Sequence, residues 1–398
     1  MISVADATAR VVAAFKPVES ETVAIDRAAG RVLARDAHAQ MTQPPAPVSS
    51  MDGYAVRAAD TARVPAQLRV IGESPAGHPY RGALKPGEAV RIFTGGVVPE
   101  GADGIVIQED ATVDGDRVTL NATARPAKHI RAAGMDFRTG DVLAKAGRRL
   151  TARDVSLLAA GDLATLDVRR KPIVAIAATG DELSRPGEKH PPGGIVASSG
   201  YALHAMIETW GGEVRDLGIL PDTIEAIAGI ADRAAGADLI VTLGGASVGD
   251  HDLIQKGLAS RGFELDFWKI AMRPGKPLIF GRLGGTPLLG LPGNPVSTYV
   301  CAILFLRAAI MAMLGSDTAL PVLSARVAKP LAANDTRQDY LRANLSLRDG
   351  EYWVEALSIQ DSSMLSSLAR ADALILRAPH APALDAGARV DVLPLGDV

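Results

Sequence analysis

The feature that most limits the possible folds is an alternation of apolar strands with helices that begins at Lys171 and runs to about residue 316. Strands joined by helices in this way form a parallel sheet with right-handed crossovers. We therefore predict a doubly wound, mostly parallel α/β domain over residues 171–316, in which ligands bind beyond the C-terminal ends of the strands. The periodicity predicts strands at 173–178, 213–219, 238–243, 265–270, 278–280 and 287–291, and helices at 200–210, 223–235, 252–261 and 296–314.

The remaining residues follow a different pattern. The N-terminal segment begins with a helical pattern and ends in the run Gln43-Pro44-Pro45-Ala46-Pro47, which cannot form a regular helix or a central strand. Short strand-like runs separated by Gly, Pro and Asp turns follow it and recur near the C-terminus, and a helix is expected at 152–160. We predict a discontinuous linker domain, formed by residues 1–47 together with 137–170. We also predict two β-rich domains, one at residues 48–136 and the other at residues 317–398.

Composition narrows the range of functions. A chain of 398 residues is long enough for two to four domains. The net charge of −3 and the aromatic content of 4% argue against binding to nucleic acid. The single cysteine, Cys301, excludes an internal disulfide and cysteine-rich zinc sites, and we interpret it as a core residue. We see no signal peptide, and the longest apolar run, 300–314, contains Arg307 and is too short to span a bilayer, so we expect a cytoplasmic enzyme.

One strand-to-helix turn is a candidate anion site. The strand 287–291 runs into Pro292-Gly293-Asn294-Pro295, and a long apolar helix follows at once. Asn294 is a suitable N-cap, and Pro295 suits the first helical position because its missing N–H would be unpaired there. The free N–H groups and partial positive charge of such a helix end attract anions. Many turns of this kind bind nothing, so a purely structural role is an equal alternative.

Two further loops follow predicted strands of the same domain. The loop after the predicted strand 238–243 contains glycines that allow backbone N–H groups to approach a phosphate, although neither a Walker loop nor a dinucleotide fingerprint is present. We interpret His251 as a loop residue, because no second histidine shares its spacing. Three loops at strand ends in one domain indicate a common ligand site. The two loops are Thr179-Gly180-Asp181-Glu182-Leu183 and Gly244-Gly245-Ala246-Ser247-Val248-Gly249-Asp250-His251-Asp252.

The charges around these loops have both signs. Lys269, Arg273 and Lys276 lie in a proline-bounded loop and suit a phosphate or another oxoanion. Carboxylates repel such anions directly, but they hold Mg²⁺, which bridges to phosphate oxygens. The alternative is that they cap helices, since Asp252 stands where a helix should begin. The candidate carboxylates are Asp181, Glu182, Asp250 and Asp252.

Two turns in the segment 48–136 are also dense in polar residues. Ser49-Ser50-Met51-Asp52-Gly53-Tyr54 places an acidic residue before a strand, and Thr94-Gly95-Gly96 follows one. From the residues alone, both are ordinary turns.

Taken together, these motifs identify a family. The chain resembles the molybdopterin molybdenumtransferases, the MoeA-type enzymes related to the E domain of gephyrin. The matching motifs stand in the family's order and span nearly the whole chain. They are Ser50-Met51-Asp52-Gly53-Tyr54-Ala55, Thr94-Gly95-Gly96 with Pro99, Gly134 with Asp136, Thr179-Gly180-Asp181-Glu182-Leu183, Gly244-Gly245 with Ser247-Val248-Gly249 and Asp252, Lys269 with Pro274-Gly275-Lys276-Pro277, and Leu291-Pro292-Gly293-Asn294-Pro295.

The resemblance implies an elongated, four-domain homodimer, with the linker domain in dimerisation and a barrel-like domain at 317–398. It implies that the α/β domain binds molybdopterin and that the domain 48–136 faces this site from the other subunit. The implied reaction inserts molybdate into the dithiolene of adenylylated molybdopterin, with Mg²⁺-dependent release of AMP. It also implies transient contact with a molybdopterin adenylyltransferase and with molybdoenzyme apoproteins, without nucleic acid or membrane.

The resemblance assigns roles to individual residues. The implied catalytic residues are Asp52, Thr94, Asp136, Glu182 and Asp252, and the implied metal ligands are Asp250, Asp252 and Glu182. The implied residues that bind molybdopterin and molybdate are Thr179, Gly180, Asp181, Gly244, Gly245, Ser247, Gly249, Lys269, Arg273, Lys276, Pro292, Gly293, Asn294 and Pro295.

The chain departs from the family pattern at a few positions, and two other functions stay open. Ala197-Ser198-Ser199 lacks a carboxylate and an amide that the family often carries, Met135 and Ala246 differ from common residues, and Arg273 stands where lysine is common. One alternative is an adenylyltransferase-like enzyme, although such proteins resemble only the α/β domain. The other is a non-catalytic scaffold that binds molybdopterin.

Overall fold

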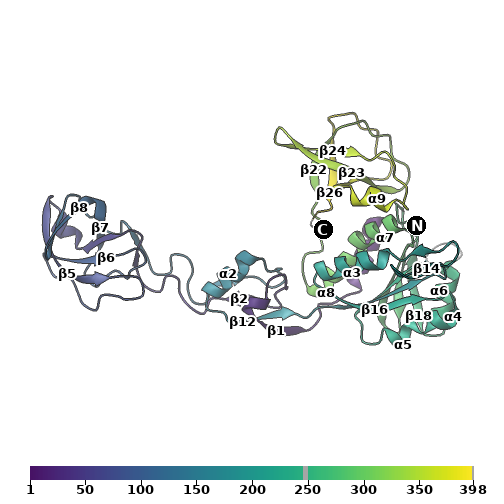
Figure 1. Ribbon diagram of the computed structural model, residues 1–398, viewed down its shortest axis with the longest axis horizontal. Coiled ribbons are helices and arrows are strands. Elements are labelled where there is room, and N and C mark those ends of the chain that lie inside the picture. The colour runs from purple at the N-terminus through teal and green to yellow at the C-terminus, as the bar shows by residue number, and fades with distance from the viewer. Residues whose placement is uncertain (245–249, 397–398) are drawn as a thin grey trace. The chain divides into compact units, whose positions relative to one another are not determined.

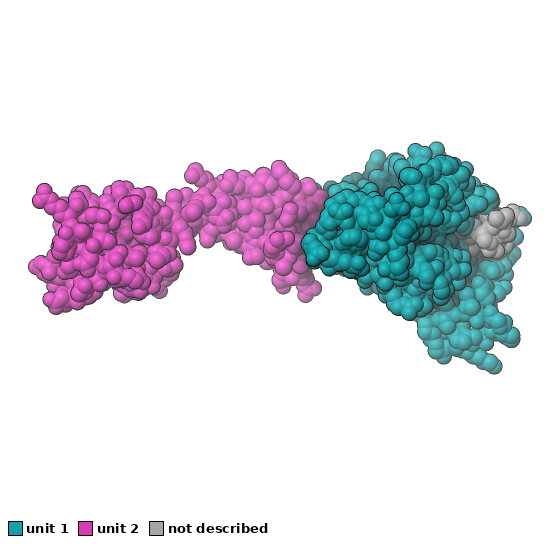
Figure 2. All heavy atoms as spheres, turned by 90° about the horizontal axis from the view of Figure 1, so that it is seen from above, with its two compact units in different colours: residues 1–21, 30–34, 168–398 teal, residues 22–29, 35–167 magenta. Residues whose placement is uncertain are grey.

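The computed structural model describes residues 1–244 and 250–396, and for residues 250–253 it describes the helical backbone alone. The chain forms two compact units, which Figure 2 colours separately. Unit 1 holds residues 1–21, 30–34 and 168–398, and unit 2 holds residues 22–29 and 35–167. We describe each unit by itself, and the predicted boundaries of four domains stay a prediction.

Unit 1 contains a six-stranded sheet with the order β16-β13-β17-β21-β20-β18. The first four strands are parallel, as predicted. β20 alone runs in the opposite direction and pairs antiparallel with both of its neighbours, β21 and β18. β20 and β21 are joined by only two residues, which form a hairpin and leave no room for a crossover helix. The strands are β13 (Ile173–Thr179), β16 (Glu213–Leu220), β17 (Leu239–Leu243), β18 (Phe263–Trp268), β20 (Ile279–Leu283) and β21 (Thr286–Leu291).

Helices cover both faces of this sheet (Figure 1). One face packs on α1 (Val4–Ala13), α3 (Ser199–Thr209) and the helix that follows β21. The other face packs on α4 (Ile224–Ala228), α5 (Ile230–Arg233) and α6 (Asp250–Ala259). The helix predicted at 223–235 is therefore two short helices, which meet at Gly229, a residue with low helix propensity.

The helix after β21 is the most apolar element of the chain. It consists of α7 (Pro295–Cys301), a π-helical segment η4 (Ala302–Leu306) and α8 (Arg307–Leu314). With 20 residues and a mean hydropathy of 1.9, it is long and apolar enough to cross a membrane. The expectation that this segment is too short to span a bilayer, which considered only residues 300–314, was therefore wrong. However, 83% of it is buried inside the protein, as in the core helix of a globular fold.

The C-terminal part of unit 1 is a closed five-stranded barrel with the order β23-β24-β22-β26-β25, in which β25 pairs again with β23. A short strand of the α/β region, β19 (Met272–Arg273), adds to β23 in parallel. The sequence analysis did not identify β23, because two buried polar residues, Asp339 and Arg342, interrupt its apolar pattern. The barrel elements are β22 (Leu323–Val327), β23 (Gln338–Arg348), β24 (Glu351–Ala356), α9 (Leu365–Ala369), β25 (Ala373–Arg377) and β26 (Arg389–Pro394).

Unit 2 is built around a six-stranded sheet with the order β7-β4-β6-β5-β9-β8, which agrees with the short strand-like runs expected in this region. A small lobe with helix α2 (Ala152–Ala160) accompanies it. The sheet strands are β4 (Gly53–Val56), β5 (Ala66–Ser74), β6 (Glu88–Ile92), β7 (Gly104–Ile107), β8 (Ala111–Asp114) and β9 (Arg117–Leu120). Shorter elements elsewhere are β1 (Ser20–Ala24), η1 (Ile25–Arg27), β2 (Ala37–His38), β3 (Val48–Ser49), η2 (Ala58–Thr61), η3 (Gln108–Asp110), β10 (Ile130–Arg131), β11 (Val142–Ala144), β12 (Thr165–Arg169), β14 (Leu183–Ser184) and β15 (Ile195–Val196).

The N-terminus of α2 yields a stability prediction. Asp154 is 6% exposed and forms a capping box with Thr151. Burial raises the pKa of Asp154, but hydrogen bonds from Thr151 and Arg148 outweigh it and lower the pKa to about 2. Because the folded pKa lies below the unfolded one, this stabilisation is present above pH 4 and is lost as the pH falls toward 2. Asp154→Ala should lower the free energy of unfolding by about 2 kcal/mol at neutral pH.

The measurement is urea denaturation of the whole chain at pH 7 and at pH 3. The matched control is Ser156→Ala, which removes an exposed polar group from the same helix and should change stability by less than about 0.5 kcal/mol. An Asp154→Ala effect no larger than that of the control at pH 7 would contradict the prediction.

Candidate functional site

A cavity of about 880 Å³ lies beyond the C-terminal ends of β13, β17 and β21 in unit 1. The loops after these three strands form one wall, and the loop 272–277 forms another. The barrel closes a third side with the loop 360–363. The cavity therefore lies where a doubly wound sheet is expected to bind its ligand.

The structure brings most of the predicted site residues of the α/β domain to this cavity. Asp181 and Lys269 are not among the lining residues. Asp181 accepts a hydrogen bond from the Asp222 N–H (3.2 Å), and the Lys269 Nζ lies 3.7 Å from the centre of the Trp268 ring. Gly245, Ser247 and Gly249 and the side chains of Asp250 and Asp252 lie outside the described residues. The predicted residues that line the cavity are Thr179, Gly180, Glu182, Gly244, Arg273, Lys276, Pro292, Gly293, Asn294 and Pro295.

The Pro-Gly-Asn-Pro turn has the predicted backbone, but the Asn294 side chain does not form the hydrogen bond expected of an N-cap. Asn294 is the N-cap and Pro295 takes the first helical position. The Asn294 amide does not cap the helix; it donates to the Ser362 hydroxyl at 3.0 Å. The Val296 N–H, the first that the helix offers, donates to the Ser362 carbonyl at 3.1 Å. The barrel therefore takes one of the N–H groups that we expected an anion to use.

Two glycines allow the strand-end loops to approach closely. Gly180 has φ +147°, and a Cβ there would lie 2.7 Å from a Glu182 carboxylate oxygen. Gly244 has φ +89°, and a Cβ there would lie 2.8 Å from the Thr179 carbonyl oxygen. Glycine adopts these backbone conformations without strain, and its missing side chain leaves room for the Glu182 carboxylate at the cavity wall.

The cations of the cavity wall differ in how far their charge is already compensated. Arg273 donates to the buried Asp339 and to Asp335 at 3.3 Å, and the hydrogen bond with Asp339 raises the pKa of Arg273. Arg337 contacts the same Asp335 at 3.4 Å. Lys276 is exposed and, within the described residues, forms no ion pair. Lys276 is thus the wall cation whose charge is most available to an anionic ligand.

Several lining residues carry no signal that sequence reasoning could use. Gln360, Ser362 and Ser363 come from a barrel loop far along the chain from the strand ends. This loop is held tightly, since the Gln360 amide donates to the Arg342 and Leu357 carbonyls at 2.9 and 2.8 Å. Its position depends on tertiary packing, which no local pattern reports. The other lining residues that were not predicted to bind ligand include Ser198, Ser199, Asp222 and Arg337.

Unit 2 brings together two predicted residues that are 42 positions apart in the sequence. The Thr94 N–H and hydroxyl both donate to one Asp52 carboxylate oxygen, at 2.7 and 2.9 Å. These hydrogen bonds, helped by the charge of Arg91, lower the pKa of Asp52 and keep it ionised. Arg91 itself lies between the rings of Tyr54 and Phe93. Asp136, the third predicted residue of this unit, donates its N–H to the Gln43 carbonyl at 3.1 Å.

No described part of the chain gathers three or more His, Cys, Asp or Glu side chains into a group that could hold a metal ion. Glu182 is the one predicted metal ligand whose side chain is described, and it lines the cavity. The predicted set of Glu182, Asp250 and Asp252 therefore stays a prediction.

Comparison with known proteins covers nearly the full length of the chain. Residues 2–161 match the MoeA N-terminal region (domains I and II), residues 175–312 a probable molybdopterin-binding domain, and residues 324–395 the MoeA C-terminal region (domain IV). Molybdopterin molybdenumtransferases of Nostoc sp. and Haemophilus influenzae are 35% and 33% identical over 95% of this chain, covering 89% and 94% of those proteins.

Solved structures agree in fold. The molybdopterin biosynthesis MoeA protein from Pyrococcus horikoshii OT3 superposes with a TM-score of 0.87 at 26% identity, covering 99% of this chain and 100% of that one. The ordered motifs, the cavity at the strand ends and these full-length matches lead to one conclusion: the chain belongs to the MoeA family of molybdopterin molybdenumtransferases.

Proposed function

We propose that this chain inserts molybdenum into molybdopterin, with adenylylated molybdopterin and molybdate as substrates and with AMP released alongside molybdenum cofactor. The observation that carries the proposal is the cavity at the ends of β13, β17 and β21, with Lys276 on its wall. The full-length match to molybdopterin molybdenumtransferases supports it. We propose that the reaction takes place in the cytoplasm.

The chemistry of the wall suits two anionic substrates. Two unit charges 4 Å apart repel each other by about 4 kcal/mol at an effective dielectric constant near 20, so a site that joins molybdate to a phosphate ester must supply positive charge. Lys276 supplies a full charge, and Arg273 a partly compensated one. The Ser362 hydroxyl accepts from the Asn294 amide, so its O–H can donate to an oxoanion oxygen without adding negative charge.

The described donor set is compatible with Mg²⁺. Mg²⁺ prefers oxygen ligands, and the lining of the cavity includes the Glu182 carboxylate and several serine residues. We propose Glu182, Asp250 and Asp252 as the residues that would hold the ion. When bound, Mg²⁺ supplies charge neutralisation at the phosphate oxygens of the adenylyl group.

We propose that the Asp52–Thr94 pair, together with Asp136, acts on the same substrates from the second subunit of a homodimer. The two hydrogen bonds from Thr94 hold one Asp52 oxygen and keep the carboxylate charged, which suits a group that orients a hydrogen-bond donor of the substrate. Transient contacts with a molybdopterin adenylyltransferase and with molybdoenzyme apoproteins would supply the substrate and receive the product.

The first test is the reaction itself. Purified protein with adenylylated molybdopterin, molybdate and Mg²⁺ should release AMP and form molybdenum cofactor, measured by chromatography of the nucleotide and by reconstitution of an apo-molybdoenzyme. Removal of Mg²⁺ with EDTA should stop AMP release. Folded protein that releases no AMP, or that instead adenylylates molybdopterin with ATP, would refute the proposal.

The second test concerns Lys276. A charge-assisted hydrogen bond to an oxoanion contributes about 1.5–3 kcal/mol, so Lys276→Met should raise the KM for molybdate about 10- to 100-fold. Lys276→Arg keeps the charge and should restore much of the affinity. The control is Lys171→Met, the same change at an exposed lysine just before β13, at the opposite end of that strand from the cavity. Equal molybdate KM values for the Lys276→Met and Lys171→Met variants would count against this role.

The third test concerns the shared site. Asp52→Ala and Glu182→Ala should each abolish most of the activity as homodimers. Mixed heterodimers should regain up to about half of the wild-type activity per dimer, because one of their two sites then carries no substitution. Tagged heterodimers that are purified, verified by mass and still inactive would place Asp52 and Glu182 in the same subunit's site.

A further inference from the structure

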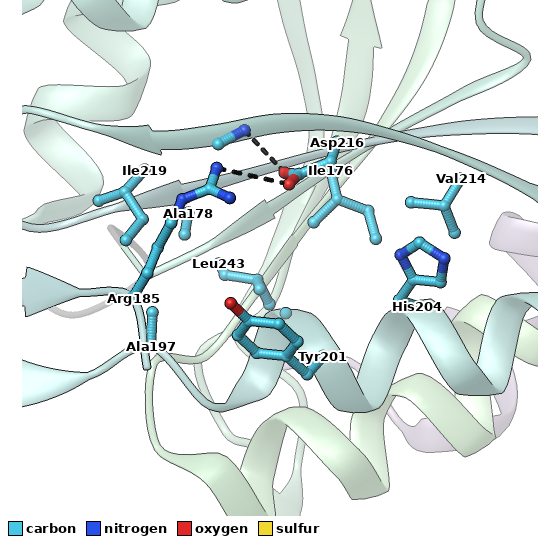
Figure 3. A pocket seen from close by; sticks show the side chains of 12 residues that line it. Ile176, Ala178, Arg185, Ala197, Tyr201, His204, Val214, Asp216, Ile219 and Leu243 are labelled. Carbon is cyan, nitrogen blue, oxygen red and sulfur yellow. Dashed lines mark hydrogen bonds and ion pairs between the residues drawn. The ribbon is translucent and has the colours of Figure 1, made fainter. Parts of the chain in front are cut away.

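A second, smaller hollow of about 80 Å³ opens beside the large cavity, between helix α3 and the edge strand β16 (Figure 3). Ala178, Ala197, Gly200 and Leu243 line both spaces. A ligand in the large cavity can therefore extend a ring into this hollow. None of the motifs in the sequence pointed to it.

The hollow has apolar walls on the side of the sheet, and the rings of Tyr201 and His204 on the side of α3. Ile176, Val214 and Ile219 project from the strands, and Tyr201 extends from α3 toward them, as Figure 3 shows. Tyr201 is 55% exposed, so much of its ring stays open to a ligand. A slot between an apolar sheet face and an aromatic ring suits a flat heterocycle, which gains from stacking and apolar contact.

A β-bulge places a carboxylate at the rim of this slot. Asp216 pairs with Ile176 and Gly218 with the next residue, Ala177, so Leu217 is an extra residue in β16. Gly218 has φ +80°, and its N–H donates to one Asp216 carboxylate oxygen at 2.7 Å. Bulges of this kind redirect side chains, and the hydrogen bond fixes how the Asp216 carboxylate is turned.

An arginine stands beside that carboxylate without saturating it. The Arg185 guanidinium lies 3.6 Å from the second Asp216 oxygen, which is too far for a direct hydrogen bond. Within the described residues, the Arg185 side chain makes no closer polar contact. The rim thus presents the acceptor oxygens of Asp216 and, next to them, the donor N–H groups of Arg185.

This order matches one kind of ring edge. A pterin presents a 2-amino group, an N3–H and a 4-oxo group in sequence, that is two donors followed by an acceptor. The carboxylate of Asp216 can accept from the first two and Arg185 can donate to the third. An adenine edge sets its amino group beside a ring nitrogen lone pair, which would face the carboxylate and repel it.

We propose that this hollow binds the aminopyrimidinone end of the substrate's pterin, with Asp216 and Arg185 as its hydrogen-bonding partners and Tyr201 as its stacking partner. The proposal rests on the proposed function, because that function supplies the pterin. It leaves the phosphate and the dithiolene of molybdopterin in the large cavity, where Lys276 and Ser362 lie.

The test is equilibrium binding of molybdopterin to the whole chain, measured anaerobically by fluorescence titration. Asn offers one acceptor where Asp offers two, so Asp216→Asn must lose a charge-assisted hydrogen bond and should weaken molybdopterin binding about 10- to 100-fold. Tyr201→Ala should weaken it about tenfold, whereas Tyr201→Phe keeps the ring and should bind like wild type. AMP, titrated separately, should bind all variants with wild-type affinity.

The matched control is Asp232→Asn, the same change at an exposed aspartate that pairs with Arg261 outside the hollow. Molybdopterin affinity within twofold of wild type in both Asp216→Asn and Tyr201→Ala overturns the proposal. A loss that appears for AMP instead also overturns it, because the hollow would then hold the nucleotide base. Wild-type protein that binds no molybdopterin would refute the proposed function itself, an outcome distinct from a failure confined to the variants.

Discussion

Burial of the apolar helix 295–314 is the constraint on which the rest of unit 1 depends. Its side chains share one core with the sheet strands and with helices α1 and α3. The same core includes Tyr340, Leu374 and Leu393 of the barrel, so one helix fixes both the α/β layer and the C-terminal domain. The N-terminus of this helix is also the point where the loop around Ser362 joins the Pro-Gly-Asn-Pro turn. The packing that stabilises the fold therefore also sets the distance between two walls of the cavity.

Charge balance separates the structural cation of the cavity from the available one. Asp339 is 3% exposed, and a buried carboxylate without a partner destabilises a fold by several kcal/mol. Arg273 provides that partner, and it does so from β19, the strand that joins the α/β region to the barrel. Much of the Arg273 charge is thus compensated by an ion pair that joins the α/β region to the barrel. Lys276, three residues later in the same loop, forms no ion pair with the described residues, so its charge is available to bind an anionic ligand.

The sequence predicted those features that periodicity and local chemistry determine. Strands and helices of the α/β domain fall close to their predicted positions, and three strand-end loops meet at one cavity because parallel strands end at the same edge of a sheet. What the sequence could not predict depends on contacts between distant segments. The Asn294 side chain meets a barrel loop in place of its own helix, and β23 was missed because buried Asp339 and Arg342 interrupt its apolar pattern. The bulge in β16 is equally non-local, since its extra residue shows only against the register of β13.

The residues proposed for one reaction are organised in two separate units, each complete in itself. In unit 2 the Asp52–Thr94 pair is already hydrogen-bonded, and Arg91, between two aromatic rings, adds charge beside it. In unit 1 the cavity is lined entirely by residues of that unit. Neither arrangement needs the other in order to form, so folding does not force the two sets together within one chain. A homodimer can then join the pair of one subunit to the cavity of the other without any change in the fold of either unit, which is why heterodimers that carry one defect in each unit distinguish the two arrangements.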